Sequence, residues 1–201
     1  MTNQRIKSIA KDQVKTSFGE IFVGILIVNV IISVASSWTI GLAALIIGGP
    51  MYVGLFYYLL IIARGQNSKF EDLFMGFKQF IRNMLGSLLV SIYVLLWSFL
   101  LIIPGIIKAF SYSMVFYIMA DDPNISVDDA ISLSRKIMDG NKMKLFELRI
   151  SFIGWMLLGI FTFGLLYIWL IPYMQMAEVN FYEDLISKIT PKDDDFVETA
   201  Y

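Results

Sequence analysis

Residues 21–63 read IFVGILIVNVIISVASSWTIGLAALIIGGPMYVGLFYYLLIIA and contain no Asp, Glu, Lys or Arg. Two further windows are similar, because residues 83–120 carry one charge, Lys108, and residues 150–177 carry none. A bilayer core of about 30 Å needs about 20 apolar helical residues, so each window is long enough for at least one span. The sequence therefore predicts an all-α integral membrane protein.

The overall composition agrees and excludes several classes of function. The chain is 57% hydrophobic and 16% charged, whereas soluble domains are about 45–50% apolar and about 25% charged. It has no Cys and no His, which removes disulfides, thiolate metal sites, Cys nucleophiles and the commonest general base. No phosphate loop or dinucleotide fingerprint is present. We expect no enzyme, no catalytic residues, no metal, no cofactor and no nucleic-acid partner.

The basic residues lie between the apolar windows and set the expected topology. Four Lys or Arg precede the first window, four lie in residues 64–82 and five in residues 121–149. If each window is a hairpin, all these segments lie on one side, which the positive-inside rule identifies as cytoplasmic. We therefore predict about six spans with both termini in the cytoplasm; four or five spans are the alternatives. The outer turns are expected near residues 38–41, 97–105 and 162–164.

The order of segments suggests a loose repeat within one membrane domain, residues 1–189. The units cover about residues 4–64, 65–122 and 123–188, and each has an amphipathic basic helix, an apolar stretch, a late proline and more apolar residues. The prolines are Pro50, Pro104 and Pro172. Proline removes a helical hydrogen bond, so we expect three proline-kinked hairpins with helix breaks at these positions. Residues 190–201 form an acidic tail that we expect to be disordered.

The three amphipathic helices are the best functional lead. In the second, apolar residues recur at helical spacing from Phe70 to Met84, opposite several charges. Such helices could lie in the headgroup plane and attract anionic lipid, or pack against the bundle; both interpretations stay open. The candidate headgroup contacts are Lys78, Arg82, Arg135, Lys136 and Lys142.

A few polar residues within the apolar windows form a candidate intramembrane site. Lys108 could bind an anionic group, or its side chain could extend to the interface. It is interfacial if the hairpin turns at Pro104 and deep if it turns near Trp97. Polar residues also follow Pro172, as in transporter sites beside broken helices, although hydrogen bonds between helices would explain them too. These residues are Gln175, Glu178 and Asn180.

Two pairs of adjacent carboxylates could hold a divalent cation or serve an intramembrane enzyme. They are Asp121 with Asp122 and Asp128 with Asp129. Neighbouring helical residues point about 100° apart, so turn and helix-start roles are the simpler interpretation. Ser126 and Asp129 resemble a capping box, and Gly140 suits a helix end.

Several short strings indicate a family resemblance that covers about residues 5–188. They are ARG at 63–65, FMGF at 74–77, LIIPGIIK at 101–108, ADDP at 120–123, SLSR at 132–135, KLF at 144–146, SFIGW at 151–155, IPY at 171–173 and FYEDL at 181–185. The chain resembles the bacterial integral membrane family catalogued as domain of unknown function 975. The family's Trp before KLF is replaced by Met143.

The resemblance implies a multi-pass protein of the bacterial plasma membrane. It also implies a looser kinship with the membrane domain of some glycerophosphodiester phosphodiesterases, but no activity and no catalytic residues. The first functional hypothesis is a non-enzymatic accessory component that binds anionic lipid and acts with a protein partner or a second copy of itself. The alternatives are a transporter built on proline-broken helices and, third, a carboxylate enzyme using Asp121 or Asp128.

Overall fold

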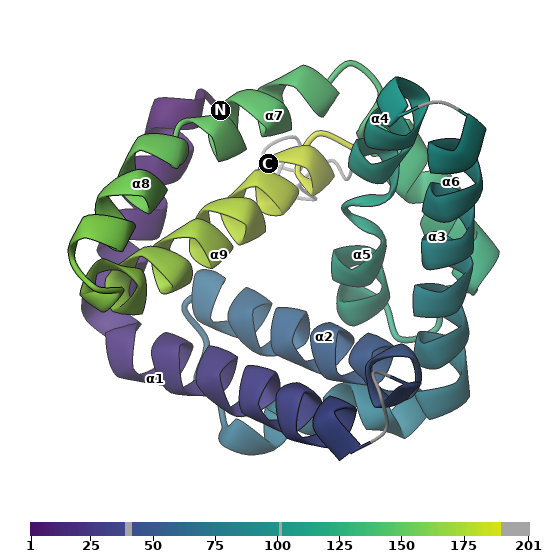
Figure 1. The fold of residues 1–201 in the computed structure, drawn as a ribbon, viewed down its shortest axis with the longest axis horizontal. Helices are drawn as coiled ribbons and strands as arrows, with labels where there is room; N and C mark the ends of the chain where they lie inside the picture. The colour runs from purple at the N-terminus through teal and green to yellow at the C-terminus, as the bar shows by residue number, and fades with distance from the viewer. Residues whose placement is uncertain (39–41, 101, 190–201) are drawn as a thin grey trace, which may run out of the picture.

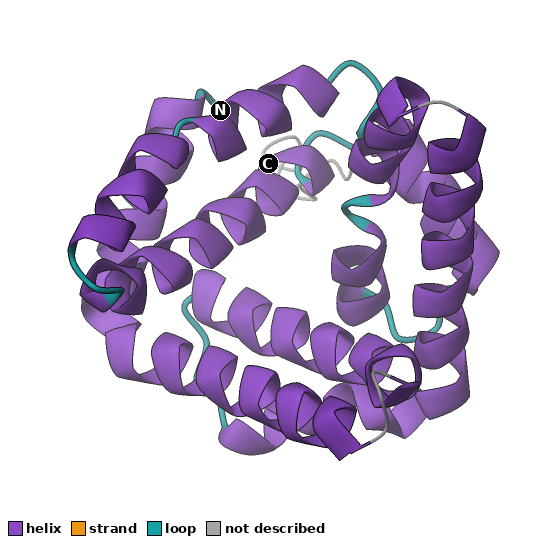
Figure 2. Cartoon of the chain, viewed as in Figure 1, coloured by secondary structure: helices purple, strands orange, loops and turns teal. Residues whose placement is uncertain are grey.

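The computed structural model describes residues 1–38, 42–100 and 102–189, and every regular element in these ranges is helical (Figures 1 and 2). The elements are α1 (Asn3–Trp38), α2 (Leu42–Ala63), the 3-10 helix η1 (Phe70–Gln79), α3 (Phe80–Leu100), α4 (Ile102–Tyr112), α5 (Val115–Asp121), α6 (Val127–Ile137), α7 (Lys142–Ile150), α8 (Ile153–Phe161) and α9 (Leu165–Ile186). Three stretches are long and apolar enough to cross a membrane: Asn3–Ser37, Ile46–Ala63 and Phe70–Phe99. The all-α class and the membrane-compatible helices are confirmed.

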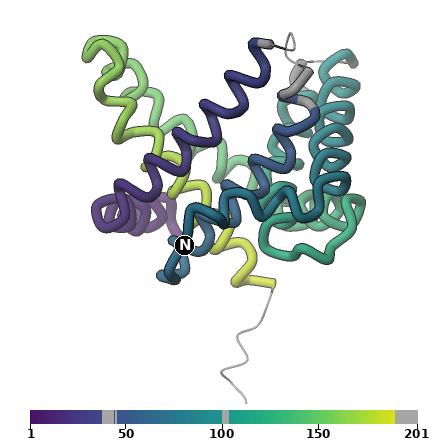
Figure 3. Tube along the Cα trace, turned by 90° about the horizontal axis from the view of Figure 1, so that it is seen from below, coloured from purple at the N-terminus to yellow at the C-terminus, as the bar shows by residue number. Residues whose placement is uncertain are grey.

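Three helical hairpins point their turns toward one end of the molecule, which we call the hairpin end (Figure 3). They are α1–α2, α3–α4 and α8–α9. The third turn lies at the expected residues, 162–164, and has positive φ angles of 52° at Phe163 and 88° at Gly164. The other two expected turns include residues 39–41 and 101, which lie outside the described residues, as does the predicted tail 190–201. The amphipathic segments lie at the opposite end, which we call the basic end.

The helices of the three hairpins differ in length, and some are too short to form one of six full membrane spans. Helix α4 has 11 residues and α8 has nine, while crossing the bilayer core takes about 20. Breaks at Ser113 and Ser151 separate α4 from α5 and α7 from α8, and α1 is kinked at Ser17, with φ of −118° and ψ of 32°. The hydroxyl groups of Ser113 and Ser151 donate to the carbonyl groups of Phe110 and Leu148, which stabilises backbone freed at each break.

The predicted helix breaks at the prolines are not observed. Pro50 and Pro172 lie inside α2 and α9, which continue through them. Pro104 lies in the first turn of α4. The amide groups of a first turn have no partner within the helix, so a proline there removes no hydrogen bond. The breaks occur at serines instead, where a side-chain hydroxyl can replace a backbone partner.

The three amphipathic segments differ in what their apolar faces contact. In the first part of α1, Ile6, Ala10 and Val14 are fully buried. In α6 the buried residues are Ala130, Ile131, Ser134 and Ile137, so these two helices pack against the bundle.

The second segment is a 3-10 helix instead of the expected α-helix. It buries Leu73 and Gly76 and leaves Phe70 and Phe74 exposed. Phe70 and Phe74 are therefore accessible from outside the protein, whereas Phe77 is partly buried against the core.

Helix α2 lies at the centre and contacts α1, η1, α3, α5 and α9. An aromatic stack joins three helices, because the ring of Tyr117 in α5 lies 4.1 Å from that of Phe56 in α2 and 5.5 Å from that of Tyr182 in α9, between ring centroids. On another face α2 touches η1 backbone to backbone. A Cβ atom at Gly54 would overlap the carbonyl group of Leu73, and one at Gly76 would overlap that of Pro50.

Replacing Gly54 with alanine should therefore destabilise the protein. The added methyl group must push η1 away from α2, and overpacking of this kind costs about 1–3 kcal/mol of unfolding free energy. Thermal unfolding in detergent should show a lower Tm for Gly54→Ala. The matched control is Gly19→Ala, also within a helix, where nothing lies within 4 Å of the new Cβ. Its Tm should be unchanged or slightly raised. Equal Tm values for the two variants would contradict the close packing.

Candidate functional site

A basic groove lies where α4 meets α6 and the start of α7. Its volume is about 510 Å³. It is lined by Lys108, Ser111, Ser132, Arg135, Lys136, Asp139 and Lys142. Three of the five predicted headgroup contacts thus converge with Lys108, which the sequence placed in a separate intramembrane set. Four cations face one carboxylate in this groove, so its net charge is positive.

Local sequence explains how the groove is built. The hydroxyl oxygen of Ser126 accepts a hydrogen bond from the amide of Asp129 at 3.1 Å and starts α6. Between α6 and α7, Gly140 adopts a positive φ of 73°, which ends the helical conformation and redirects the chain toward α7. The capping and the helix end predicted from the sequence are confirmed. Buried Ser134 donates to the carbonyl group of Ser111 at 2.9 Å, which ties α6 to α4.

The groove cations lack the partners that other cations at the basic end have. Within residues 1–38, 42–100 and 102–189, neither Arg135, Lys136 nor Lys142 takes part in an ion pair. Elsewhere, carboxylates pair with other cations, as Glu178 does with Arg149. The positive charge of the groove is therefore available to an anion from outside the described part of the chain.

Lys108 lies on α4, at the edge of this groove. Since α3 ends at Leu100 and α4 begins at Ile102, the hairpin turns between the two positions considered from the sequence. The ammonium group lies 4.5 Å from the ring centroid of Trp97, close enough for a cation–π interaction. Lys108 is thus partly covered by an aromatic ring, and it belongs with the groove and not with the polar residues of α9.

The three polar residues of α9 face different partners. The carboxylate of Glu178 accepts two hydrogen bonds from Arg149, at 2.8 and 3.0 Å. The side-chain amide of Asn180 donates to that of Gln13 in α1. Gln175 lines a separate cavity of about 300 Å³ between α1, α2 and α9, and its buried Oε1 has no hydrogen-bond partner among the described residues. The structure does not bring these residues together with Lys108.

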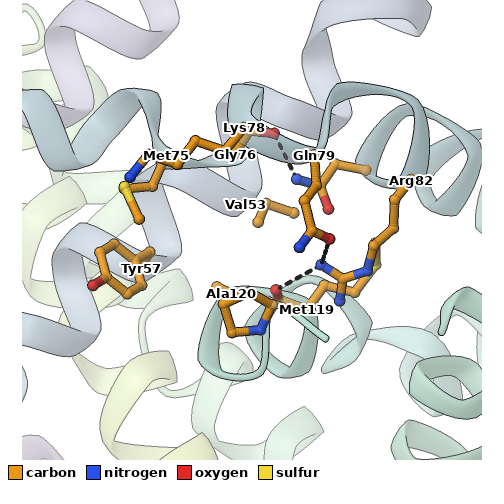
Figure 4. Close-up of a pocket in the computed structure, with 11 residues that line it drawn as sticks. Val53, Tyr57, Met75, Gly76, Lys78, Gln79, Arg82, Met119 and Ala120 are labelled. Atoms are coloured by element: carbon orange, nitrogen blue, oxygen red, sulfur yellow. Dashed lines mark hydrogen bonds between the residues drawn. The ribbon is translucent and has the colours of Figure 1, made fainter. Parts of the chain in front are cut away.

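Lys78 and Arg82 line another hollow, of about 100 Å³, between η1, α2 and α5 (Figure 4). The guanidinium group of Arg82 donates to the carbonyl groups of Ile125 at 2.7 Å and Asp122 at 2.9 Å, and to the side chain of Gln79 at 2.9 Å. Arg82 therefore fixes the 122–125 loop against α3, and its donors are already engaged. Lys78 is exposed.

The adjacent carboxylates have structural partners. Asp121 pairs with Arg64 at 2.7 Å and accepts a hydrogen bond from Tyr182 at 3.0 Å. The carboxylate of Asp122 accepts a hydrogen bond from the backbone amide of Asn124 at 2.8 Å, a contact within the turn. Asp128 is exposed in the first turn of α6. In the described ranges no group of three or more His, Cys, Asp or Glu residues is placed to hold a metal ion.

An ion-pair centre forms at Asp184, and it was not predicted from the sequence. This carboxylate is only 4% exposed and pairs with the N-terminal ammonium of Met1, with Lys144 at 3.2 Å and with Lys188 at 2.8 Å. Burial alone would raise the pKa of Asp184, but the hydrogen bonds from Lys188, the N-terminus and Lys144 outweigh it and lower the pKa to about 2. The partners come from both ends of the chain and from α7, so no local motif marks the site.

Because the folded-state pKa of Asp184 lies below its ordinary value of 3.8, ionised Asp184 stabilises the protein above about pH 4. This contribution, about 2 kcal/mol, is lost as the pH falls toward 2. We expect Asp184→Asn to lower the Tm in detergent at pH 7, and the difference from wild type to shrink below pH 4. Glu147→Gln, an exposed carboxylate of α7, is the control and should change little. A Tm difference that stays constant with pH would contradict this role.

Comparison with known proteins gives one family. A family model described as Protein of unknown function (DUF975) matches residues 1–111 and 99–188. No curated protein and no solved structure matches the chain. The matched ranges contain α1 to α9, the basic groove and Asp184.

Proposed function

The chain belongs to the DUF975 family of proteins of unknown function, and from its own structure we propose that it is a multi-pass protein of the bacterial plasma membrane with both termini in the cytoplasm. It acts as a non-enzymatic accessory component that binds anionic lipid at the cytoplasmic face and works with a protein partner or a second copy of itself. The proposal rests on its apolar hairpins, its basic end and its unpaired groove cations.

The observation that carries the proposal is the division of the surface into two zones. Large apolar side chains are exposed near the hairpin turns, with Phe99 at 82% and Phe163 at 100%. A soluble protein rarely exposes such a patch without covering it, and lipid tails would cover these residues. The unpaired cations of the groove gather at the basic end. The positive-inside rule then places that end in the cytoplasm.

The short arms fit this orientation in different ways. Helix α4 is about 17 Å long at 1.5 Å per residue, and α5 follows it after the break at Ser113, so the second hairpin returns through two short helices. Helix α9 has 22 residues and is about 33 Å long. Helix α8 reaches only about 14 Å and continues from the charged helix α7. In the third hairpin, α9 is therefore long enough to cross the bilayer core, whereas α8 extends through only part of it.

The basic end supports a role at the membrane surface. Exposed Phe70 and Phe74 lie on the same segment as exposed Lys78, the combination that amphipathic segments use to lie among headgroups. The groove adds three unpaired cations at the same end. Lys and Arg near an anionic surface each contribute about 1 kcal/mol of binding free energy. Anionic lipid is therefore the ligand that this face suits best.

A transporter is the second candidate, and one observation favours it. Gln175, three residues beyond Pro172, lines the cavity between α1, α2 and α9, and its buried Oε1 has no hydrogen-bond partner within the described part of the chain. A solute with a hydrogen-bond donor would satisfy that atom. Reconstituted vesicles should then show flux of such a solute, and Gln175→Leu should abolish it. Absence of flux across a broad panel of solutes would reject this candidate.

The proposed topology can be tested by cysteine labelling, because the chain has no native Cys. In intact cells a membrane-impermeant maleimide should label Thr162→Cys, an exposed polar position in the turn between α8 and α9. It should label Gln66→Cys and Asn124→Cys, exposed at the basic end, only after permeabilisation. Gly105 is unsuitable, since a Cβ there would overlap Ser98. Labelling of Thr162→Cys and Gln66→Cys from the same side would contradict the topology.

The proposed lipid role can be tested by native mass spectrometry of protein extracted in mild detergent. We expect phosphatidylglycerol or another anionic phospholipid to remain bound in excess of its share of the membrane, because the basic end carries unpaired cations. The same spectra would reveal a co-purifying subunit or a dimer. Equal retention of zwitterionic and anionic lipids would contradict the lipid part of the proposal.

A further inference from the structure

A second, apolar groove adjoins the basic one. Its volume is about 200 Å³, and it lies between α4 and α7. It is lined by Ile106, Ile107, Phe110, Lys142, Met143 and Phe146. Four of these, Ile106, Ile107, Met143 and Phe146, are exposed. The groove is thus an accessible apolar surface and not part of the core.

The two grooves meet at Lys142, which lines both. Along α4, Phe110 lies toward the basic end, while Ile106 and Ile107 lie one turn closer to the hairpin turn. The α4 residues of the two grooves alternate along the helix, since Lys108 and Ser111 line the basic groove and Ile106, Ile107 and Phe110 line the apolar one. The rings of Phe110 and Phe146 meet edge to face within the apolar groove, with centroids 5.9 Å apart. A charged zone and an apolar channel therefore lie side by side and share Lys142.

A charged groove joined to an apolar one matches a phospholipid in the cytoplasmic leaflet, which carries a negative phosphate and apolar acyl chains. We propose that α4, α6 and α7 form a binding site for one anionic glycerophospholipid. Its phosphate contacts Arg135, Lys136 and Lys142, and one acyl chain lies along Ile107 and its apolar neighbours. The inference rests on the proposed function, because it needs the basic end to face the cytoplasm.

Charge and shape together favour a lipid over other anions. A soluble phosphate would satisfy the cations and leave the apolar channel beside Lys142 empty. An acidic peptide, such as residues 193–195 of this chain, would have the same shortcoming. A neutral lipid would fill the channel and leave the cations unpaired. An anionic phospholipid has both the negative headgroup and the chain.

The first experiment compares two triple variants with equal loss of charge. The test variant is Arg135→Gln/Lys136→Gln/Lys142→Gln. The control removes three exposed cations of α1 and is Arg5→Gln/Lys11→Gln/Lys15→Gln. Each detergent-solubilised protein is titrated with phosphatidylglycerol and with phosphatidylcholine of the same chains, with bound lipid counted by native mass spectrometry.

The test variant should lose at least about tenfold in phosphatidylglycerol affinity, while the control changes no more than about threefold. Phosphatidylcholine binding should be equally weak in all three proteins. If wild type prefers phosphatidylglycerol but both variants weaken equally, the specific site is wrong and the general lipid role stands. If wild type shows no preference, the proposed lipid function itself fails.

A second experiment tests the apolar channel with the charges intact. Ile107→Trp should fill the channel and weaken phosphatidylglycerol binding at least about fivefold, because the acyl chain loses its place. Since Ile107 is exposed, the variant should keep the wild-type Tm in detergent without lipid. Free glycerol 3-phosphate at the same concentrations should not compete. Competition by glycerol 3-phosphate, or unchanged lipid binding by Ile107→Trp, would overturn the proposal in favour of a soluble-anion site.

Discussion

The backbone contact between α2 and η1 is the constraint on which the rest of the structure depends. Glycines at 54 and 76 let a carbonyl group of each segment approach the other where any Cβ would collide. Small residues are the usual means of such close approach between helices in membranes. With η1 held against α2 in this way, Leu73 is buried and Phe70 and Phe74 face outward. The other faces of α2 remain free to pack against α1, α5 and α9.

The hairpins were predictable because they follow from length and polarity alone. The charge-free windows identified the apolar helices, and Gly164 identified the turn between α8 and α9. The positions of the breaks were not predictable in the same way. Pro50 and Pro172 looked like breaks but continue a helix, whereas Ser17, Ser113 and Ser151 interrupt one. Whether a helix tolerates a lost hydrogen bond depends on neighbours that the local sequence does not reveal.

The residue types of the candidate site could be predicted from the sequence, but their positions in the fold could not. Arg135, Lys136 and Lys142 were expected at a lipid surface, and Lys108 was expected elsewhere. Their convergence depends on how α6 crosses α4, which the contact between Ser134 and Ser111 fixes. Arg82 had the same sequence features but is held by backbone carbonyls. No local sequence pattern marked the ion pairs of Asp184, because its partners are Met1, Lys144 in α7 and Lys188, one helical turn after it.

The contacts between α1 and α9 also have a consequence for biogenesis. Gln13 of α1 meets Asn180 of α9, and the amino group of Met1 meets Asp184, so α1 packs against a helix that is synthesised after α2 to α8. Until α9 has been synthesised, that contact cannot form, and α1 remains without this partner. Closure of the bundle is therefore a late event that a prematurely terminated chain would never complete, leaving its polar groups for quality-control proteases to recognise.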